Sequence, residues 1–93
     1  NIAQNKKPFI KKSDIHFDFE HSETYAKILL TAKNQQGLLA FVIEVFDELG
    51  VDIATAKVGT IKNVAKDMFL IEKSSGIEKK QKEVIKRLIS GGA

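Results

Sequence analysis

Cysteine is absent from this chain, and histidine and proline are scarce. Without cysteine there is no disulfide scaffold, no thiolate metal site and no cysteine nucleophile. The two histidines, His16 and His21, lie in one short stretch and are too few for a catalytic or metal-binding cluster, so no metal site is predicted. No apolar run approaches the roughly 20 residues of a membrane-spanning helix, and no signal-peptide pattern is present. We therefore expect a cytoplasmic protein without membrane contact.

Motifs that carry catalysis or cofactor binding are also missing. The chain has no glycine-rich phosphate loop, no serine beside a base in a recognisable nucleophile elbow and no catalytic constellation of paired carboxylates. No catalytic residue and no cofactor is predicted, so an active site of any parent enzyme must lie outside this chain. Its 93 residues suffice for one domain with its own core. The chain begins at Asn1, which suggests a piece of a longer protein.

Basic residues are concentrated at the N-terminus. The net charge is +3 and the pI is about 9.2. Four lysines fall in the first thirteen residues, which contain no acid: Lys6, Lys7, Lys11 and Lys12. Their combined charge of +4 is larger than the net charge of the whole chain, so residues 14–93 have a net charge of −1. We interpret residues 1–13, which include Pro8, as a basic linker, with a phosphate-binding arm as the alternative. Nucleic-acid binding is not predicted for the domain itself.

Hydrophobic periodicity predicts four strands and two helices. Alternating or β-branched residues indicate strands, and apolar residues spaced by three and four indicate helices. The predicted strands are Ile15–Phe19, Tyr25–Ala32, Val51–Thr60 and Val64–Glu72, and the predicted helices are residues 38–49 and 77–90. A bulge near Ala54–Thr55 keeps the inward residues of the third strand in register. The run from Ser75 to Glu78 has the pattern of a capping box that starts the second helix.

The order of these elements predicts an α+β fold. Two helices can cover one face of a four-stranded antiparallel sheet, as in a ferredoxin-like sandwich. That sandwich ordinarily closes with a strand after the second helix, and we expect Ile15–Phe19 to take its place beside Tyr25–Ala32. The third and fourth strands carry apolar residues on both faces, whereas the two helices cover only one. A homodimer is therefore expected.

The loop that leads into the first helix is the candidate binding site. It ends in Gly37, and a helix N-terminus presents unpaired N–H groups and partial positive charge to an anion or carboxylate. The candidate ligand-binding residues are Asn34, Gln35, Gln36, Gly37 and Leu38. The alternative is a polar turn that only caps the helix.

Other polar and aromatic residues have simpler explanations. We expect Asp67 to form a salt bridge with a lysine at the strand edge, and Lys57 and Thr60 to be surface residues. Three phenylalanines on strands could form a stacking platform for RNA, but the basic-aromatic signature of RNA-recognition domains is absent. We therefore assign them to the core. They are Phe17, Phe19 and Phe69.

Three runs of residues resemble the ACT domain: Asn34–Leu39, Ala56–Thr60 and Asp67–Ile71. More narrowly, the chain resembles the ACT domains at the C-terminus of bacterial PII uridylyltransferase/uridylyl-removing enzymes. The resemblance covers residues 14–90 and leaves 91–93 as a tail. It implies a regulatory domain that binds an amino acid, with glutamine favoured, and reports nitrogen status to other domains of a larger nucleotidyltransferase. It also implies a homodimer, because ACT domains commonly pair.

Two loop residues depart from the family pattern. The family has an acid at the position of Asn34 and a proline at the position of Gln36. An amide accepts and donates hydrogen bonds, but it cannot pair with a ligand ammonium as a carboxylate does. These departures leave a second hypothesis open, namely a dimerisation or interdomain docking module that binds no ligand.

Overall fold

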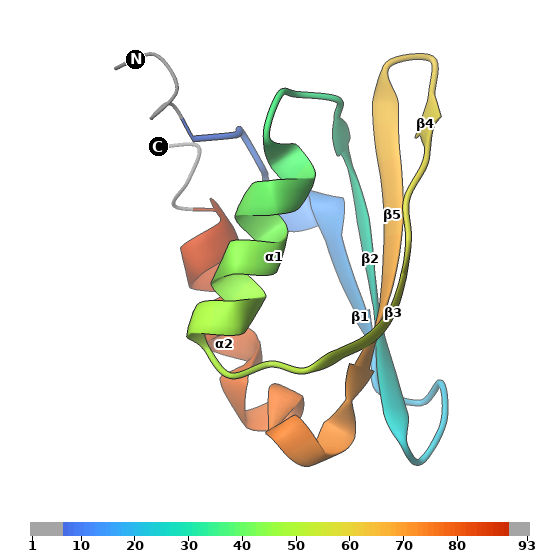
Figure 1. Ribbon diagram of the computed structural model, residues 1–93, viewed down its shortest axis with the longest axis vertical. Coiled ribbons are helices and arrows are strands. Elements are labelled where there is room, and N and C mark those ends of the chain that lie inside the picture. The colour runs from blue at the N-terminus through green and yellow to red at the C-terminus, as the bar shows by residue number, and fades with distance from the viewer. Residues whose placement is uncertain (1–6, 90–93) are drawn as a thin grey trace.

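The computed structural model describes residues 7–89 and has an α+β architecture. Its antiparallel sheet contains β1 (Ile15–Asp18), β2 (Tyr25–Lys33), β3 (Ile53–Lys57), β4 (Thr60–Ile61) and β5 (Val64–Glu72). The strand order is β1-β2-β5-β3, and β4 also pairs with β5. Two helices, α1 (Leu38–Glu48) and α2 (Ile77–Ile89), lie on one face of this sheet (Figure 1). Short 3-10 turns precede β1 at Lys12–Asp14 and α2 at Lys73–Ser75.

The core lies between the helices and the sheet. Inward residues of β2 and β5 alternate with outward ones, as expected for strands that are covered on one face. Phe46 of α1 packs edge-on against Phe69 of β5, with ring centroids 5.4 Å apart. Phe17 and Phe19 pack against the same cluster, so the three phenylalanines assigned to the core lie there. The largest enclosed side chains are Ile10, Ile28, Leu30, Val42, Phe46, Phe69, Ile71, Ile77, Val84 and Leu88.

The first strand occupies an edge of the sheet, which confirms its predicted place. β1 pairs antiparallel with β2, with Ile15 opposite Leu30 and Phe17 opposite Ile28. The short connection between the two strands brings them together. Alternation along β1 then directs both apolar residues toward the core and leaves His16 exposed.

The described sheet has five strands where four were predicted, because the third predicted strand is interrupted. β3 and β4 both pair with β5, and Val58 and Gly59 separate them. At this point the Gly59 N–H donates to a carboxylate oxygen of Asp67 rather than across the strand ladder. The Gly59 carbonyl still accepts from the Lys66 N–H at 2.8 Å. The hydrogen bond to Asp67 thus lies at the break between the two short strands.

β3 also differs from the prediction on its outer face. The expected bulge is present, since the register shifts between Ile53 and Thr55. Beyond the bulge, the positions that face away from the helices are Thr55 and Lys57, so this strand is not apolar on both faces. The uncovered face has an apolar centre on β2 and β5, formed by Leu29, Met68 and Leu70. Ile61 and Val64, which pair with each other, add apolar residues to the same face at the β4–β5 hairpin.

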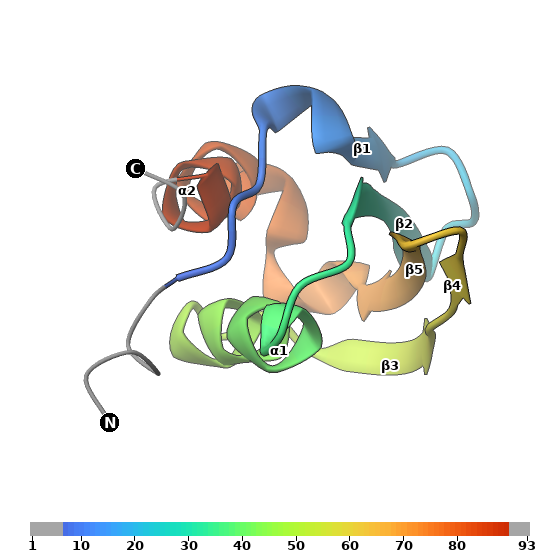
Figure 2. The same ribbon diagram turned by 90° about the horizontal axis from the view of Figure 1, so that it is seen from above.

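Part of the segment predicted as a linker packs against the domain. Pro8 is buried, and the side chain of Ile10 is only 2% exposed. Figure 2 shows this segment passing between α2 and the loop that leads into α1. Isolated apolar residues among lysines have no periodicity, so the sequence pattern gives no sign of this packing. The remaining residues 1–6 of the predicted linker, and the predicted tail at 91–93, lie outside the described residues.

The second helix begins without the predicted capping box. Ser75 belongs to the preceding 3-10 turn, and its hydroxyl donates to the Glu72 carbonyl at 2.7 Å. Gly76 follows with a φ of +80°, and the helix starts at Ile77. Because the chain reverses at Gly76, the Ser75 side chain serves the turn and not the helix.

Candidate functional site

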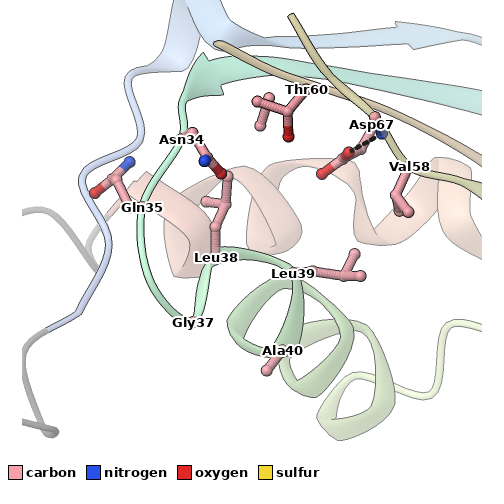
Figure 3. Close-up of a pocket in the computed structure, with 11 residues that line it drawn as sticks. Asn34, Gln35, Gly37, Leu38, Leu39, Ala40, Val58, Thr60 and Asp67 are labelled. Carbon is pink, nitrogen blue, oxygen red and sulfur yellow. Dashed lines mark hydrogen bonds between the residues drawn. The ribbon is translucent and has the colours of Figure 1, made fainter. Parts of the chain in front are cut away.

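A pocket of about 330 Å³ opens between the start of α1 and the β4–β5 hairpin. The β2–α1 loop forms one wall, and the segment between β3 and β4 forms another (Figure 3). Its volume lies in the range of small-molecule sites, about 300–1,000 Å³. The lining residues are Asn34, Gln35, Gly37, Leu38, Leu39, Ala40, Val58, Gly59, Thr60, Ala65 and Asp67.

Two turns with left-handed backbone conformations hold these walls in place. Gly37 has a φ of +79°, which allows the chain to turn directly from the loop into α1. At the hairpin tip, Lys62 and Asn63 both have positive φ, as in the tight two-residue turns that suit the twist of a hairpin. The two walls are joined by one backbone hydrogen bond, because the Asn34 N–H donates to the Asn63 carbonyl at 3.0 Å.

The first turn of α1 presents free backbone donors at the pocket. The Leu38 N–H donates to the Gln35 carbonyl at 3.2 Å, and the Phe41 N–H donates to the Gly37 carbonyl at 3.0 Å. Between them, the N–H groups of Leu39 and Ala40 have no partner among the described residues. No acidic side chain occupies this first turn. The positive end of the helix is thus open to an anion from outside.

The five predicted ligand-binding residues are not equivalent. Asn34, Gly37 and Leu38 line the pocket, whereas Gln36 is exposed and does not. Gln35 contributes to the lining, but its side chain points away from the cavity toward the N-terminal segment (Figure 3).

The Gln35 amide is occupied by backbone groups. Its Oε1 accepts from the Phe9 N–H at 2.6 Å, and its Nε2 donates to the Phe9 carbonyl at 2.9 Å. The same Nε2 donates to the Lys33 carbonyl at 2.9 Å. Gln35 therefore fastens the N-terminal segment to the loop in the way a neighbouring strand would.

Asp67 does not form the predicted salt bridge. It is 5% exposed, on the face of β5 that points into the pocket, and no lysine pairs with it among residues 7–89. One carboxylate oxygen accepts a hydrogen bond from the Gly59 N–H at 3.3 Å. Burial raises the pKa of this carboxyl above its ordinary value, and the Gly59 hydrogen bond opposes that rise less strongly.

A sequence signal for Asp67 was present. Along β5, residues two apart share a face. Asp67 is thus on the same side as Ala65, Phe69 and Ile71, all of which are buried. A charged residue inside an otherwise apolar alternation is either paired or functional.

Other polar and apolar residues of the pocket wall come from β4 and from the segment between β3 and β4. Thr60 lines the pocket, whereas Lys57 faces the other side of the sheet, opposite Met68. Val58 and Gly59 enter the lining only because the predicted third strand breaks at that point. Nothing in the local sequence indicates this break, since it depends on an acceptor that lies on another strand.

Across residues 7–89, no group of three histidine, cysteine or acidic side chains is arranged to hold a metal ion. In the same range, neither helix is long and apolar enough to cross a membrane.

Comparison with known proteins gives two kinds of match. A family model described as "Plant bHLH transcription factor, ACT-like domain" matches residues 19–91. The chain is also similar to curated bifunctional uridylyltransferase/uridylyl-removing enzymes. It is 28% identical to that of Haemophilus influenzae strain PittEE over 83 residues, which is 87% of this chain and 10% of the enzyme. It is 36% identical to that of Pasteurella multocida strain Pm70 over 66 residues, which is 71% of this chain and 8% of the enzyme.

These matches concern the domain and not a whole enzyme. The chain spans about a tenth of the length of the curated relatives it matches. No solved structure matches it. The family model covers most of the chain, and the antiparallel sheet with two helices on one face is consistent with the ferredoxin-like fold expected of such a domain. The chain therefore belongs to the ACT-like domain family.

Proposed function

We propose that this domain is a regulatory module that binds a free amino acid, with glutamine as the first candidate. The ligand would occupy the pocket between the start of α1 and the β4–β5 hairpin. The domain would belong to a larger enzyme of the uridylyltransferase kind, and the bound amino acid would report nitrogen status to the other domains of that enzyme.

The observation that carries this proposal is the open N-terminus of α1 in the pocket. The unpartnered N–H groups of Leu39 and Ala40 suit an α-carboxylate, because they donate hydrogen bonds at the positive end of a helix. The dipole alone contributes about 0.3–1 kcal/mol to such an interaction. Similarity to uridylyltransferase/uridylyl-removing enzymes supports the wider assignment.

Thermal unfolding of the 93-residue chain with each common amino acid tests the proposal. A ligand at 100 times its Kd adds about 2.7 kcal/mol of stability, which raises the midpoint of a domain this size by roughly 10–20 °C. We expect glutamine to give such a shift and glutamine amide, which lacks the α-carboxylate, to give none. Lys82→Arg, an exposed substitution on α2, should respond as the wild type does.

A second candidate function is a docking or dimerisation module without a ligand. Asn34 favours it, because the pocket loop lacks the acid expected by resemblance. If no amino acid raises the unfolding midpoint at millimolar concentration, the sensor proposal is wrong and this candidate replaces it.

We also propose that the domain forms a homodimer. The outer edge of β3 is unpaired by any described strand, and the uncovered sheet face has an apolar centre. In a dimer, the neighbouring copy would contribute to closing the pocket.

A further inference from the structure

Asp67 is a buried acid with one oxygen open to the pocket. Its Oδ1 accepts from the Gly59 N–H, whereas its Oδ2 has no hydrogen-bond partner among the described residues. Every buried side-chain nitrogen or oxygen atom in residues 7–89 does have a partner, so Oδ2 is not sealed inside the protein. The surface available to it is the pocket that Asp67 lines. Figure 3 shows the carboxylate pointing into the space bordered by Thr60, Leu38 and Leu39.

The protein gives this carboxylate little support of its own. Its single hydrogen bond, at 3.3 Å, is long, and its neighbours in the lining include Val58, Leu38 and Ala65. No described cation pairs with it, and no other pocket residue is titratable. A buried, unpaired carboxylate costs stability, so a packed hydrophobic or amide side chain would serve the fold better. The cost is offset if a cation from outside binds there.

The pocket therefore has two poles. One is the positive start of α1, with the free N–H groups of Leu39 and Ala40, and the other is the open carboxylate oxygen of Asp67. Asn34 in the loop is uncharged, so it cannot supply the negative pole. A zwitterion carries an ammonium and a carboxylate, the two charges that these poles attract.

We infer that Asp67 recognises the α-ammonium of the bound amino acid, while the start of α1 holds its α-carboxylate. This inference rests on the proposed function and adds a selection rule to it. The pocket accepts amino acids with a free amine. It rejects related molecules in which the amine is missing or acylated, because Oδ2 would then lose its cation.

The rule can be tested on the wild-type chain by calorimetry with three probes. They are L-glutamine, N-acetyl-L-glutamine, and the deamino analogue with the same carboxylate and carboxamide. We expect both amine-deficient probes to bind at least about tenfold more weakly than glutamine, the usual effect of losing a hydrogen bond to a charged group. This comparison requires no substitution, so it does not depend on how a variant folds.

Asp67→Asn provides the matching protein-side test. The amide oxygen can still accept from the Gly59 N–H, so the pocket wall is retained. We expect glutamine affinity to fall at least about tenfold and the preference for a free amine to disappear. Asp47→Asn removes one charge from an exposed position on α1 and should change neither.

The possible results separate the inference from the proposed function. If glutamine binds the wild type and Asp67→Asn equally well, the role of Asp67 is wrong and the sensor proposal stands. If the wild type binds glutamine and the deamino analogue alike, the conclusion is the same. If no amino acid binds the wild type, the sensor proposal fails and the role of Asp67 fails with it.

Discussion

At the residue scale, Asp67 is the side chain that the fold explains least and that a ligand would explain best. Its neighbours on the buried face of β5 are apolar, and its one hydrogen bond is to a backbone N–H group. Natural proteins keep such locally unfavourable residues where function requires them. Stability and binding should therefore respond in opposite directions when this charge is removed.

The first prediction concerns the pH dependence of stability. Burial raises the pKa of Asp67 in the folded protein, so the folded state binds this proton more tightly than the unfolded chain. The wild-type protein therefore gains stability from this proton at low pH. It loses that stability as the pH rises from the unfolded-state pKa of about 3.9 through the raised pKa of the folded state. The Asp67→Asn variant has no carboxyl at this position, so it does not lose this stability as the pH rises. We expect its unfolding midpoint, relative to that of the wild type, to increase between about pH 3 and pH 7 in the absence of ligand.

The difference between the two proteins is the quantity to measure, because contributions from other carboxylates cancel in it. Asp47→Asn, at an exposed position, is the control and should give a flat difference. A difference for Asp67→Asn that stays constant or falls with pH would contradict the assignment of a costly buried charge.

The second prediction concerns Gly37. A Cβ at this position would meet no atom within 4 Å, so crowding of the loop is not the reason for glycine. The reason is its φ of +79°, which costs an L-residue about 1–2 kcal/mol. We expect Gly37→Val to lower the free energy of unfolding by that amount or more. Gly37→Asn should cost less, because asparagine visits the left-handed region more readily.

Urea unfolding of both variants checks this prediction. Equal losses for valine and asparagine would show that backbone conformation is not the cause. A glutamine titration of each variant would then show whether the loop geometry also sets affinity.

At the element scale, the N-terminal segment belongs to the folded domain. Ile10 lies in the core at 2% exposure, and the neighbouring Phe9 is 56% exposed. The third prediction is that Ile10→Ala lowers the free energy of unfolding by about 2–5 kcal/mol. Phe9→Ala should stay within about 0.5 kcal/mol, since the bonds to Gln35 use only the Phe9 backbone.

The two substitutions lie at adjacent positions, so Phe9→Ala serves as the control for Ile10→Ala in denaturant unfolding. Similar midpoints for both would mean that the segment does not pack in solution. A large loss for Ile10→Ala alone would show that this segment packs as part of the domain.

The elements that follow from regular patterns could be predicted from the sequence. Both helices start where their apolar spacing begins, and Ile15–Asp18 pairs with Tyr25–Lys33 as predicted. The pocket loop was also located, because a glycine at the junction of strand and helix is a local signal. Ile10 was missed because its burial depends on packing against elements distant in the sequence, which no local pattern encodes.

Only part of the candidate site could be predicted from the sequence, because local patterns do not show which distant residues come together. Gly37 and Leu38, where the loop meets α1, were predicted and line the pocket, whereas Asp67 comes from a strand far along the chain. The Ser75 cap was mistaken because a single left-handed residue, Gly76, places the hydroxyl in the preceding turn. Short motifs indicate which contacts are possible, but tertiary structure decides which of them form.

At the scale of the whole molecule, the uncovered face of the sheet is the feature that bears on assembly. Its apolar centre is bordered by lysines on the same face: Lys27, Lys33, Lys57 and Lys66. Asp18 and Glu72 provide the opposing charge there. Two copies that meet through this face would bury Leu29 but would also bring like charges together. Salt screens such exposed charges, with a Debye length of about 8 Å at physiological ionic strength.

The fourth prediction is therefore a homodimer that strengthens with ionic strength. Light scattering at high micromolar concentration should give twice the chain mass of 10.3 kDa, with a smaller dimer fraction at low salt. Leu29→Lys should return the monomer mass, because it places a charge at the apolar centre of the face. Ile43→Lys is the matched control, since Ile43 is 40% exposed on α1 and Leu29 is 37% exposed on β2.

A wild-type mass of 10.3 kDa at every salt concentration would exclude the dimer. A dimer that tolerates Leu29→Lys would place the contact elsewhere, with the unpaired edge of β3 as the remaining candidate.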